Sequence, residues 1–145
     1  MICLDLDGTT ITHEGVLRPA VREAVQAVLA VGHHVVVATG RGIVATTPIL
    51  DALGLTKGWT VCSNGAVTVR LDPRAPQGWT LDEDDVVTFD PAPVLTRLRP
   101  VLPDALVAVE DLGVGFRLSA PYPADELVGE QTVVPWEELI AHPTT

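Results

Sequence analysis

The chain begins Met1-Ile-Cys-Leu-Asp-Leu-Asp-Gly-Thr9, and this stretch decides the fold. Its first residues are strand formers and Gly8 ends the run, which predicts a strand that carries Asp5 and Asp7 at its carboxyl end. Side chains two positions apart on a strand point to the same face. Two carboxylates this close resist joint ionisation unless a cation lies between them, and a hard cation such as Mg²⁺ suits oxygen ligands.

The residues that follow this pair favour an anion beside the cation. Gly8 and Thr9 permit a turn whose backbone N–H groups face a phosphate. The alternative is that Asp5 and Asp7 only end a strand and cap a turn. We consider that role minor, because two acids in an apolar strand are costly to bury without a ligand.

The first 65 residues alternate strands and helices. An amphipathic helix is predicted from Arg18 to the glycine at position 32, and a second helix over 43–53. Strands are predicted over 34–38, which is β-branched, and over 59–63, which ends at Asn64-Gly65. This order predicts right-handed crossovers and a parallel sheet, with the functional site at the carboxyl ends of the strands.

The pattern changes after Gly65, and we expect two domains, 1–66 and 67–145. Residues 66–71 and 79–81 predict a hairpin, and the acidic run 82–85 predicts a solvated loop or a helix start. The remaining predicted elements are a helix near 93–102, strands over 105–110 and 115–119, and a short helix over 135–140.

Composition describes a globular chain with an uneven charge. The 145 residues are 47% hydrophobic and 19% charged, with a net charge of −10. Fourteen of the 19 acidic residues, but only 4 of the 9 basic ones, lie in residues 71–145, whereas residues 1–70 are neutral. Such an acidic half repels nucleic acids and anionic membrane surfaces, so neither is an expected partner.

Two further features bear on location. No apolar stretch is long enough to span a bilayer, and acids interrupt the first apolar run, so we expect a cytoplasmic protein. Cys3 and Cys62 lie in apolar runs without metal-ligand spacing. We expect both to be small buried side chains in a reducing compartment.

Three motifs together resemble a known family. Asp5-Leu-Asp-Gly-Thr9 resembles the DxDGT signature of the haloacid-dehalogenase-like (HAD) hydrolases. Ala38-Thr-Gly-Arg41 resembles their second motif, and Ser63-Asn-Gly-Ala66 the segment that leads into the cap of the Cof-type branch. The resemblance covers about the first 70 residues. It implies an α/β fold with a Rossmann-like parallel sheet, incomplete here, followed by part of an inserted α+β cap.

The resemblance also implies roles for individual residues. Asp5 would be the nucleophile that forms an aspartyl-phosphate, and Asp7 the general acid and base. The Asp5 side chain and the Asp7 backbone carbonyl would ligate Mg²⁺. Thr39 and the Gly40 N–H would hold the transferring phosphoryl group.

Some of these residues keep alternative roles. Thr39 is also compatible with an N-cap of the second helix. Arg41 either reaches a substrate anion or pairs with an acid. Asn64 and Gly65 either face the substrate or form an ordinary turn. His13 either gates the site or is an exposed loop residue, and the latter is favoured.

The chain departs from the family after the cap begins. The family carries a third motif with a lysine and a fourth, acidic motif, yet the only lysine here is Lys57, ahead of the third predicted strand. The chain thus resembles the front part of a longer phosphatase, and we expect weakened Mg²⁺ binding and weakened transition-state stabilisation. Without the covering strand, residues 2–6 become an apolar sheet edge, so we expect self-association there.

These observations predict a Mg²⁺-dependent phosphatase of small phosphorylated metabolites, with sugar phosphates as the first guess and activity impaired in this chain. The alternative is a non-catalytic remnant that binds a phosphate ligand or a partner chain. A phosphomutase is a third possibility, since it shares the first motifs.

Overall fold

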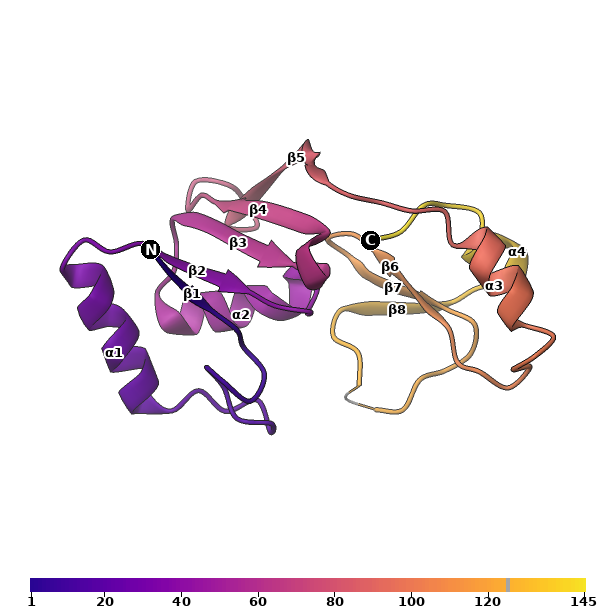
Figure 1. Cartoon of the computed structure of the whole chain (residues 1–145), viewed down its shortest axis with the longest axis horizontal. Helices are drawn as coiled ribbons and strands as arrows, with labels where there is room; N and C mark the ends of the chain where they lie inside the picture. The colour runs from indigo at the N-terminus through magenta and orange to yellow at the C-terminus, as the bar shows by residue number, and fades with distance from the viewer. Residues whose placement is uncertain (125) are drawn as a thin grey trace. The chain divides into compact units, whose positions relative to one another are not determined.

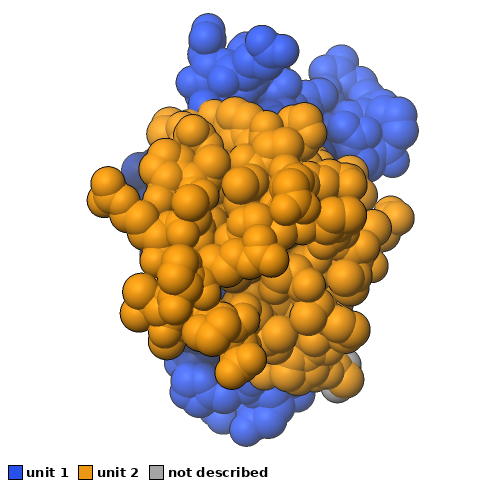
Figure 2. Space-filling view, turned by 90° about the vertical axis from the view of Figure 1, so that its right-hand side faces the viewer, with its two compact units in different colours: residues 1–86 blue, residues 87–145 orange. Residues whose placement is uncertain are grey.

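The computed structural model describes residues 1–124 and 126–145 and divides them into two compact units, Met1–Val86 and Val87–Thr145. Figure 1 labels the elements and Figure 2 colours the two units. The change in sequence pattern suggested that the first domain ends at residue 66. The first compact unit extends to Val86 because two more strands continue its sheet.

The first unit contains a five-stranded sheet in the order β1-β2-β3-β4-β5. β1, β2 and β3 run parallel, and the hairpin of β4 and β5 adds to β3 in antiparallel fashion. Two helices make the crossovers between the parallel strands (Figure 1), which confirms the predicted Rossmann-like α/β class. The element bounds are β1 Ile2–Leu4, α1 Pro19–Ala30, β2 Val35–Ala38, α2 Ile43–Leu53, β3 Gly58–Cys62, β4 Val67–Leu71 and β5 Trp79–Val86.

Both helices of the first unit pack into one hydrophobic core. α1 begins at Pro19, a residue whose fixed φ suits the first turn, and it buries Val25. α2 ends at Leu53 and is capped by Gly54, which adopts a left-handed φ of 75°. The core cluster joins Val25 to Val37 of β2 and to Leu53 of α2. Burial of this apolar face, rather than helix propensity, holds the crossovers in place.

Two sequence predictions in the first unit need correction. β1 ends at Leu4, so Asp5 and Asp7 lie beyond the strand instead of within it. The acidic run 82–85, expected as a loop or helix start, belongs to β5. The β4–β5 register steps from Val69↔Leu81 to Val67↔Val86, so this run forms an irregular stretch opposite a single residue of β4. Its solvation, however, is as expected, because most of the run is exposed.

The second unit is an α+β segment with its own small core. In its sheet β6 pairs with β7 in antiparallel fashion, and β7 pairs with β8 in parallel. We did not predict β8, because its four residues are all exposed and carry no apolar alternation. The core residues are Leu95, Val107, Val109 and Leu139. The element bounds are α3 Ala92–Leu98, β6 Ala108–Asp111, β7 Gly115–Leu118, β8 Glu130–Val133 and α4 Trp136–Leu139.

The two cysteines differ in environment. Neither forms a disulfide, but Cys62 is buried whereas Cys3 is exposed. The expectation of burial is therefore wrong for Cys3, because β1 lies at the edge of the sheet. Among the described residues, no helix has both the length and the apolar character needed to cross a membrane.

Substitution of the buried Leu53 tests the packing of the core. Leu53 is 0% exposed, so Leu53→Ala should lower the free energy of unfolding by about 2–5 kcal/mol through lost burial and a residual cavity. Urea denaturation followed by circular dichroism measures the change. Val31→Ala, at a side chain that is 73% exposed, should change it by less than about 0.5 kcal/mol. Equal effects of the two substitutions would contradict this account of the core.

Candidate active site

The loop after β1 is anchored by Leu6. This side chain is 0% exposed, while its neighbours Asp5 and Asp7 are both exposed. The backbone N–H groups of Thr10 and Ile11 donate to the Leu6 carbonyl at 3.0 and 2.9 Å, and the Thr10 hydroxyl donates to the Asp5 carbonyl at 2.5 Å. Burial of Leu6 therefore fixes the backbone from which the two carboxylates project.

The ends of β2 and β3 are joined by backbone hydrogen bonds. The Thr39 N–H donates to the Val61 carbonyl at 2.9 Å, and the Thr39 carbonyl accepts the N–H of Asn64 at 3.2 Å. The Ser63 N–H donates to the Arg41 carbonyl at 2.9 Å. These bonds bring Thr39, Arg41 and Asn64 into one cluster, as expected for polar residues at the carboxyl ends of parallel strands.

The backbone of this cluster is tightly folded. Ser63 and Asn64 begin the short 3₁₀ turn η1 (Ser63–Gly65) with φ values of 49° and 55°, both in the left-handed region. Gly65 also has a positive φ, of 97°. A Cβ atom at Gly40 would lie 2.9 Å from the Asn64 Oδ1 atom. Glycine at position 40 therefore permits the close approach, and the left-handed pair is a local strain of the kind found at functional sites.

An ion pair joins this cluster to the loop after β1. Arg41 forms a bidentate ion pair with Asp7. Its Nε donates to Oδ2 at 2.9 Å, and its Nη2 donates to Oδ1 at 2.6 Å. The hydrogen bonds from Arg41 hold the pKa of Asp7 below its ordinary value, and the charge of His13 acts in the same direction. The same contact raises the pKa of Arg41. Of the two roles left open for Arg41, the structure thus shows pairing with an acid.

The Thr39 side chain lies at the centre of the cluster. It is 5% exposed, and its Oγ1 accepts the N–H of Arg41 at 3.1 Å. The first helical residue of α2 is preceded by Gly42 as N-cap, so Thr39 is not the cap that the sequence allowed. Because Oγ1 is an acceptor in this contact, its own hydrogen is available to a ligand oxygen.

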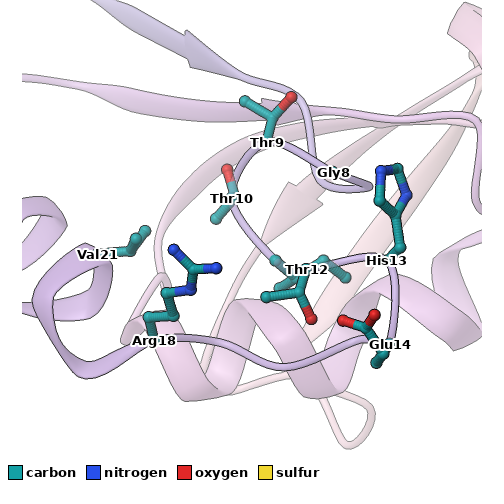
Figure 3. Close-up of a pocket in the computed structure, with 9 residues that line it drawn as sticks. Gly8, Thr9, Thr10, Thr12, His13, Glu14, Arg18 and Val21 are labelled. Atoms are coloured by element: carbon teal, nitrogen blue, oxygen red, sulfur yellow. The ribbon is translucent and has the colours of Figure 1, made fainter.

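Gly8 and Thr9 lie on a different pocket from the Thr39 cluster. They line a cavity of about 340 Å³ in the loop after β1, together with residues 10–14, Arg18 and Val21 (Figure 3). Gly8 has a φ of 72°, and a Cβ atom there would lie 2.8 Å from the His13 ring. His13 is exposed, as expected, and it lies beside Gly8 in this loop.

The predicted metal ligands supply few donors. Among the described residues, no group of three or more His, Cys, Asp or Glu side chains could hold a metal ion. Asp7 has both carboxylate oxygens engaged by Arg41, while the Asp5 carboxylate has no hydrogen bond or ion pair to another described residue. The Asp5 carboxylate and backbone carbonyls are therefore the available oxygen donors, a set that suits Mg²⁺ only with water and ligand oxygens beside them.

Two residues of the site were missed in the sequence. Thr10 is 4% exposed and braces the Asp5 carbonyl, and Ser63 supports the Arg41 backbone. Thr10 gave a weak signal, as a second hydroxyl residue directly after the Gly-Thr pair. Ser63 was part of the quoted Ser63-Asn-Gly-Ala66 stretch, but its role was not predicted, because a left-handed φ at serine follows from the packed turn and not from its residue type.

Comparisons with known proteins agree with these motifs. The family model of haloacid dehalogenase-like hydrolases matches residues 2–87. Over 99 residues the chain is 34% identical to pyridoxal phosphate phosphatase YbhA of Escherichia coli (strain K12). That match covers 68% of this chain and 32% of the relative, so the chain spans about a third of the length of this curated protein.

Solved structures show the same fold. A haloacid dehalogenase-like hydrolase from B. subtilis has a TM-score of 0.60 at 24% identity, over 83% of this chain and 39% of its own. BT1666 from Bacteroides thetaiotaomicron, described among phosphatases of the haloalkanoate superfamily, has a TM-score of 0.60 at 25% identity, over 84% and 42%. With its motifs at the strand ends and a family match over more than half of its length, the chain belongs to the haloacid dehalogenase-like hydrolases.

Proposed function

We propose that this chain carries the nucleophile of a phosphatase that acts on small phosphorylated metabolites. The observation that supports the proposal is the unequal state of the two carboxylates. Asp5 is exposed and unpaired among the described residues, whereas Asp7 is held by Arg41 next to Thr39. A free carboxylate beside a fixed acidic group suits nucleophilic attack followed by proton transfer.

The proposed reaction has two steps. An Asp5 oxygen forms a bond to phosphorus while the bond from phosphorus to the leaving oxygen breaks, and protonated Asp7 gives its proton to that oxygen. Asp7 then takes a proton from water, whose oxygen attacks the phosphorus and releases phosphate and free Asp5. The Thr39 hydroxyl and the backbone N–H of Gly40 would donate to the phosphoryl oxygens, with Asn64 and Gly65 facing the substrate.

We include Mg²⁺ in the proposal as the family's usual counter-charge. When bound, it would offset the negative charge of the phosphoryl group. The Asp5 carboxylate and the Asp7 backbone carbonyl would hold it, because the Asp7 side chain is engaged by Arg41. Two protein oxygens fit the habit of Mg²⁺, which keeps several waters and shares phosphate oxygens of a substrate.

Support for the substrate class comes from a relative. The curated relative is named a pyridoxal phosphate phosphatase, which is a phosphatase of a small phosphorylated molecule. We extend the class, and not the compound, to this chain. We therefore propose both sugar phosphates and pyridoxal phosphate as substrates to be tested. We assign the second unit, an α+β segment, to the inserted cap. A cytoplasmic location also stays a prediction.

One observation favours a second candidate function, a phosphate-binding chain without catalysis. Arg41 occupies both oxygens of Asp7 and holds its pKa low, which opposes the protonated form that a general acid needs. The described residues also lack a third ligating side chain for a metal. Binding of phosphate by the cluster of Thr39, Arg41 and Asn64 requires neither a protonated Asp7 nor a third metal-ligating side chain.

A hydrolysis assay separates the two candidates. The chain should release p-nitrophenol from p-nitrophenyl phosphate in the presence of Mg²⁺, and Asp5→Asn should lower the rate by about 10²-fold or more because the nucleophile is lost. Asp51→Asn, at an exposed acid of α2, is the matched control and should leave the rate unchanged. If the chain and Asp5→Asn release product equally while inorganic phosphate binds to both in calorimetry, the binding function replaces the catalytic one.

The Arg41–Asp7 pair predicts a pH dependence. Because Arg41 lowers the Asp7 pKa in the folded state, the pair stabilises the fold above the unfolded-state pKa of Asp and loses this effect as pH falls through the folded pKa. Arg41→Ala should therefore raise the Asp7 pKa, measured by carboxyl NMR without divalent ions. At pH 7 it should cost less than about 1 kcal/mol of stability, since the two side chains are 29% and 48% exposed.

Arg41→Lys provides the control for this titration. Lysine keeps the positive charge, but its single ammonium cannot reproduce the bidentate geometry of the guanidinium. The Asp7 pKa should therefore lie between its values in the original chain and in Arg41→Ala. An Asp7 pKa that is the same in all three proteins would show that the ion pair does not form in solution.

A further inference from the structure

Thr10 lies on the turn that follows the two carboxylates, and it is almost fully buried. The turn is closed by the Leu6 carbonyl, which accepts the backbone N–H groups of residues 9–11 at 2.9–3.2 Å. It brings Thr10 (Figure 3) back against residue 5, where the Thr10 hydroxyl donates to the Asp5 carbonyl at 2.5 Å. Only 4% of Thr10 is exposed, so the packing around it holds the hydroxyl in place.

The backbone of Asp5 is held on both sides. On the amino-terminal side, Leu4 pairs with Val37 in the parallel register of β1 and β2. On the carboxyl-terminal side, the Thr10 hydroxyl holds the carbonyl of the peptide group that joins Asp5 to Leu6. The direction of a Cα–Cβ bond is set by the backbone atoms around it, and the side chain then has only a few staggered rotamers. Fixing both peptide groups therefore fixes the direction in which the Asp5 carboxylate projects.

The two carboxylates are held in different ways. Asp7 is bound through its side chain, because Arg41 donates to both of its carboxylate oxygens. The Thr10 hydroxyl donates instead to the main-chain carbonyl of Asp5, so this bond uses neither oxygen of the Asp5 carboxylate. A donor bound to a carboxylate oxygen occupies a lone pair that attack on phosphorus requires, whereas a donor bound to the main-chain carbonyl does not. A hold through the backbone therefore suits a side chain that acts as a nucleophile.

We propose that Thr10 is the positioning residue of Asp5: its hydroxyl fixes the peptide group after Asp5 and thereby directs the carboxylate at the phosphorus of a bound phosphate. Nucleophilic attack needs the reacting atoms about 3–3.5 Å apart and aligned, and a displacement of about 1 Å can lower the rate about a hundredfold. Position 10 therefore requires a hydroxyl, although the DxDGT-like stretch ends at Thr9. For its chemical consequence this role rests on the proposed phosphatase function, whereas the fixed peptide group can be measured without catalysis.

NMR relaxation tests the fixed peptide group directly. The amide order parameter of Leu6 reports the motion of the peptide group between Asp5 and Leu6, and it should be about 0.85 in the original chain. It should fall toward about 0.6 in Thr10→Val, because valine keeps the shape of threonine but lacks the hydroxyl. Thr10→Ser keeps the hydroxyl and should keep the order parameter high. An order parameter that is the same in the original chain and in Thr10→Val would overturn the inference.

Thr60→Val is the matched control. Thr60 is 0% exposed within β3, and its hydroxyl donates to the Val37 carbonyl at 3.2 Å, so this substitution removes the same kind of buried hydrogen bond. Both valine variants should therefore lower the urea midpoint of unfolding by similar amounts. Only Thr10→Val should lower the order parameter of Leu6. An equal fall in Thr60→Val would show a general loosening of the fold and would contradict the role of Thr10.

Hydrolysis of p-nitrophenyl phosphate with Mg²⁺ tests the chemical consequence. Thr10→Val should lower kcat by about 10- to 100-fold and leave KM within about twofold, because a misdirected carboxylate impairs attack and not phosphate binding. Thr10→Ser should restore most of kcat, and Thr60→Val should leave it unchanged. An unchanged kcat in Thr10→Val, or an equal loss in Thr60→Val, would rule out positioning by Thr10. If the original chain releases no product, the proposed function fails, and the order parameter of Leu6 alone then decides whether Thr10 fixes this peptide group.

Discussion

The bidentate ion pair between Arg41 and Asp7 is the interaction on which the site depends. It joins the loop after β1 to the loop after β2, and the second loop is in turn bonded to η1 after β3. Three chain segments far apart in sequence are thus held at one end of the sheet. The contact is partly exposed, so its contribution to stability is small, and its main effect is to fix the direction and ionisation of Asp7.

This arrangement gives two similar carboxylates different surroundings. Asp5 and Asp7 are two positions apart, yet Asp7 has a fixed partner and Asp5 has none among the described residues. The difference originates in Leu6, whose burial fixes the backbone between them, and in Arg41, which reaches only one of the pair. Two acids of equal intrinsic pKa can take different roles when their environments differ in this way.

Much of this structure was visible in the sequence, and the reasons for the exceptions are physical. The parallel core followed from runs such as 34–38, because a continuous β-branched run is typical of a strand buried in a parallel sheet. The DxDGT-like stretch located the two carboxylates. The acidic run 82–85 was misassigned because Leu81 and Val86 on either side of it pair with β4, so the run becomes an irregular stretch within β5 despite its low strand propensity. The exposed β8 carried no pattern at all. In the site, the partner of Arg41 and the left-handed φ of Ser63 depend on tertiary packing, which residue types do not report.

The placement of charge in the first unit is consistent with an anionic ligand at this end of the sheet. In the strand order, β5 is separated from β2 by β3 and β4, which puts it about 14 Å from β2 at the usual strand spacing. That separation exceeds the Debye length of about 8 Å at physiological ionic strength, and the acids of β5 are largely exposed, so their repulsion is mostly screened at Thr39. Arg41 is the nearest cation to Asp7, and it offsets a negative charge inside the cluster itself. The acidic run of β5 therefore imposes little electrostatic cost on an anion bound at the ends of the parallel strands.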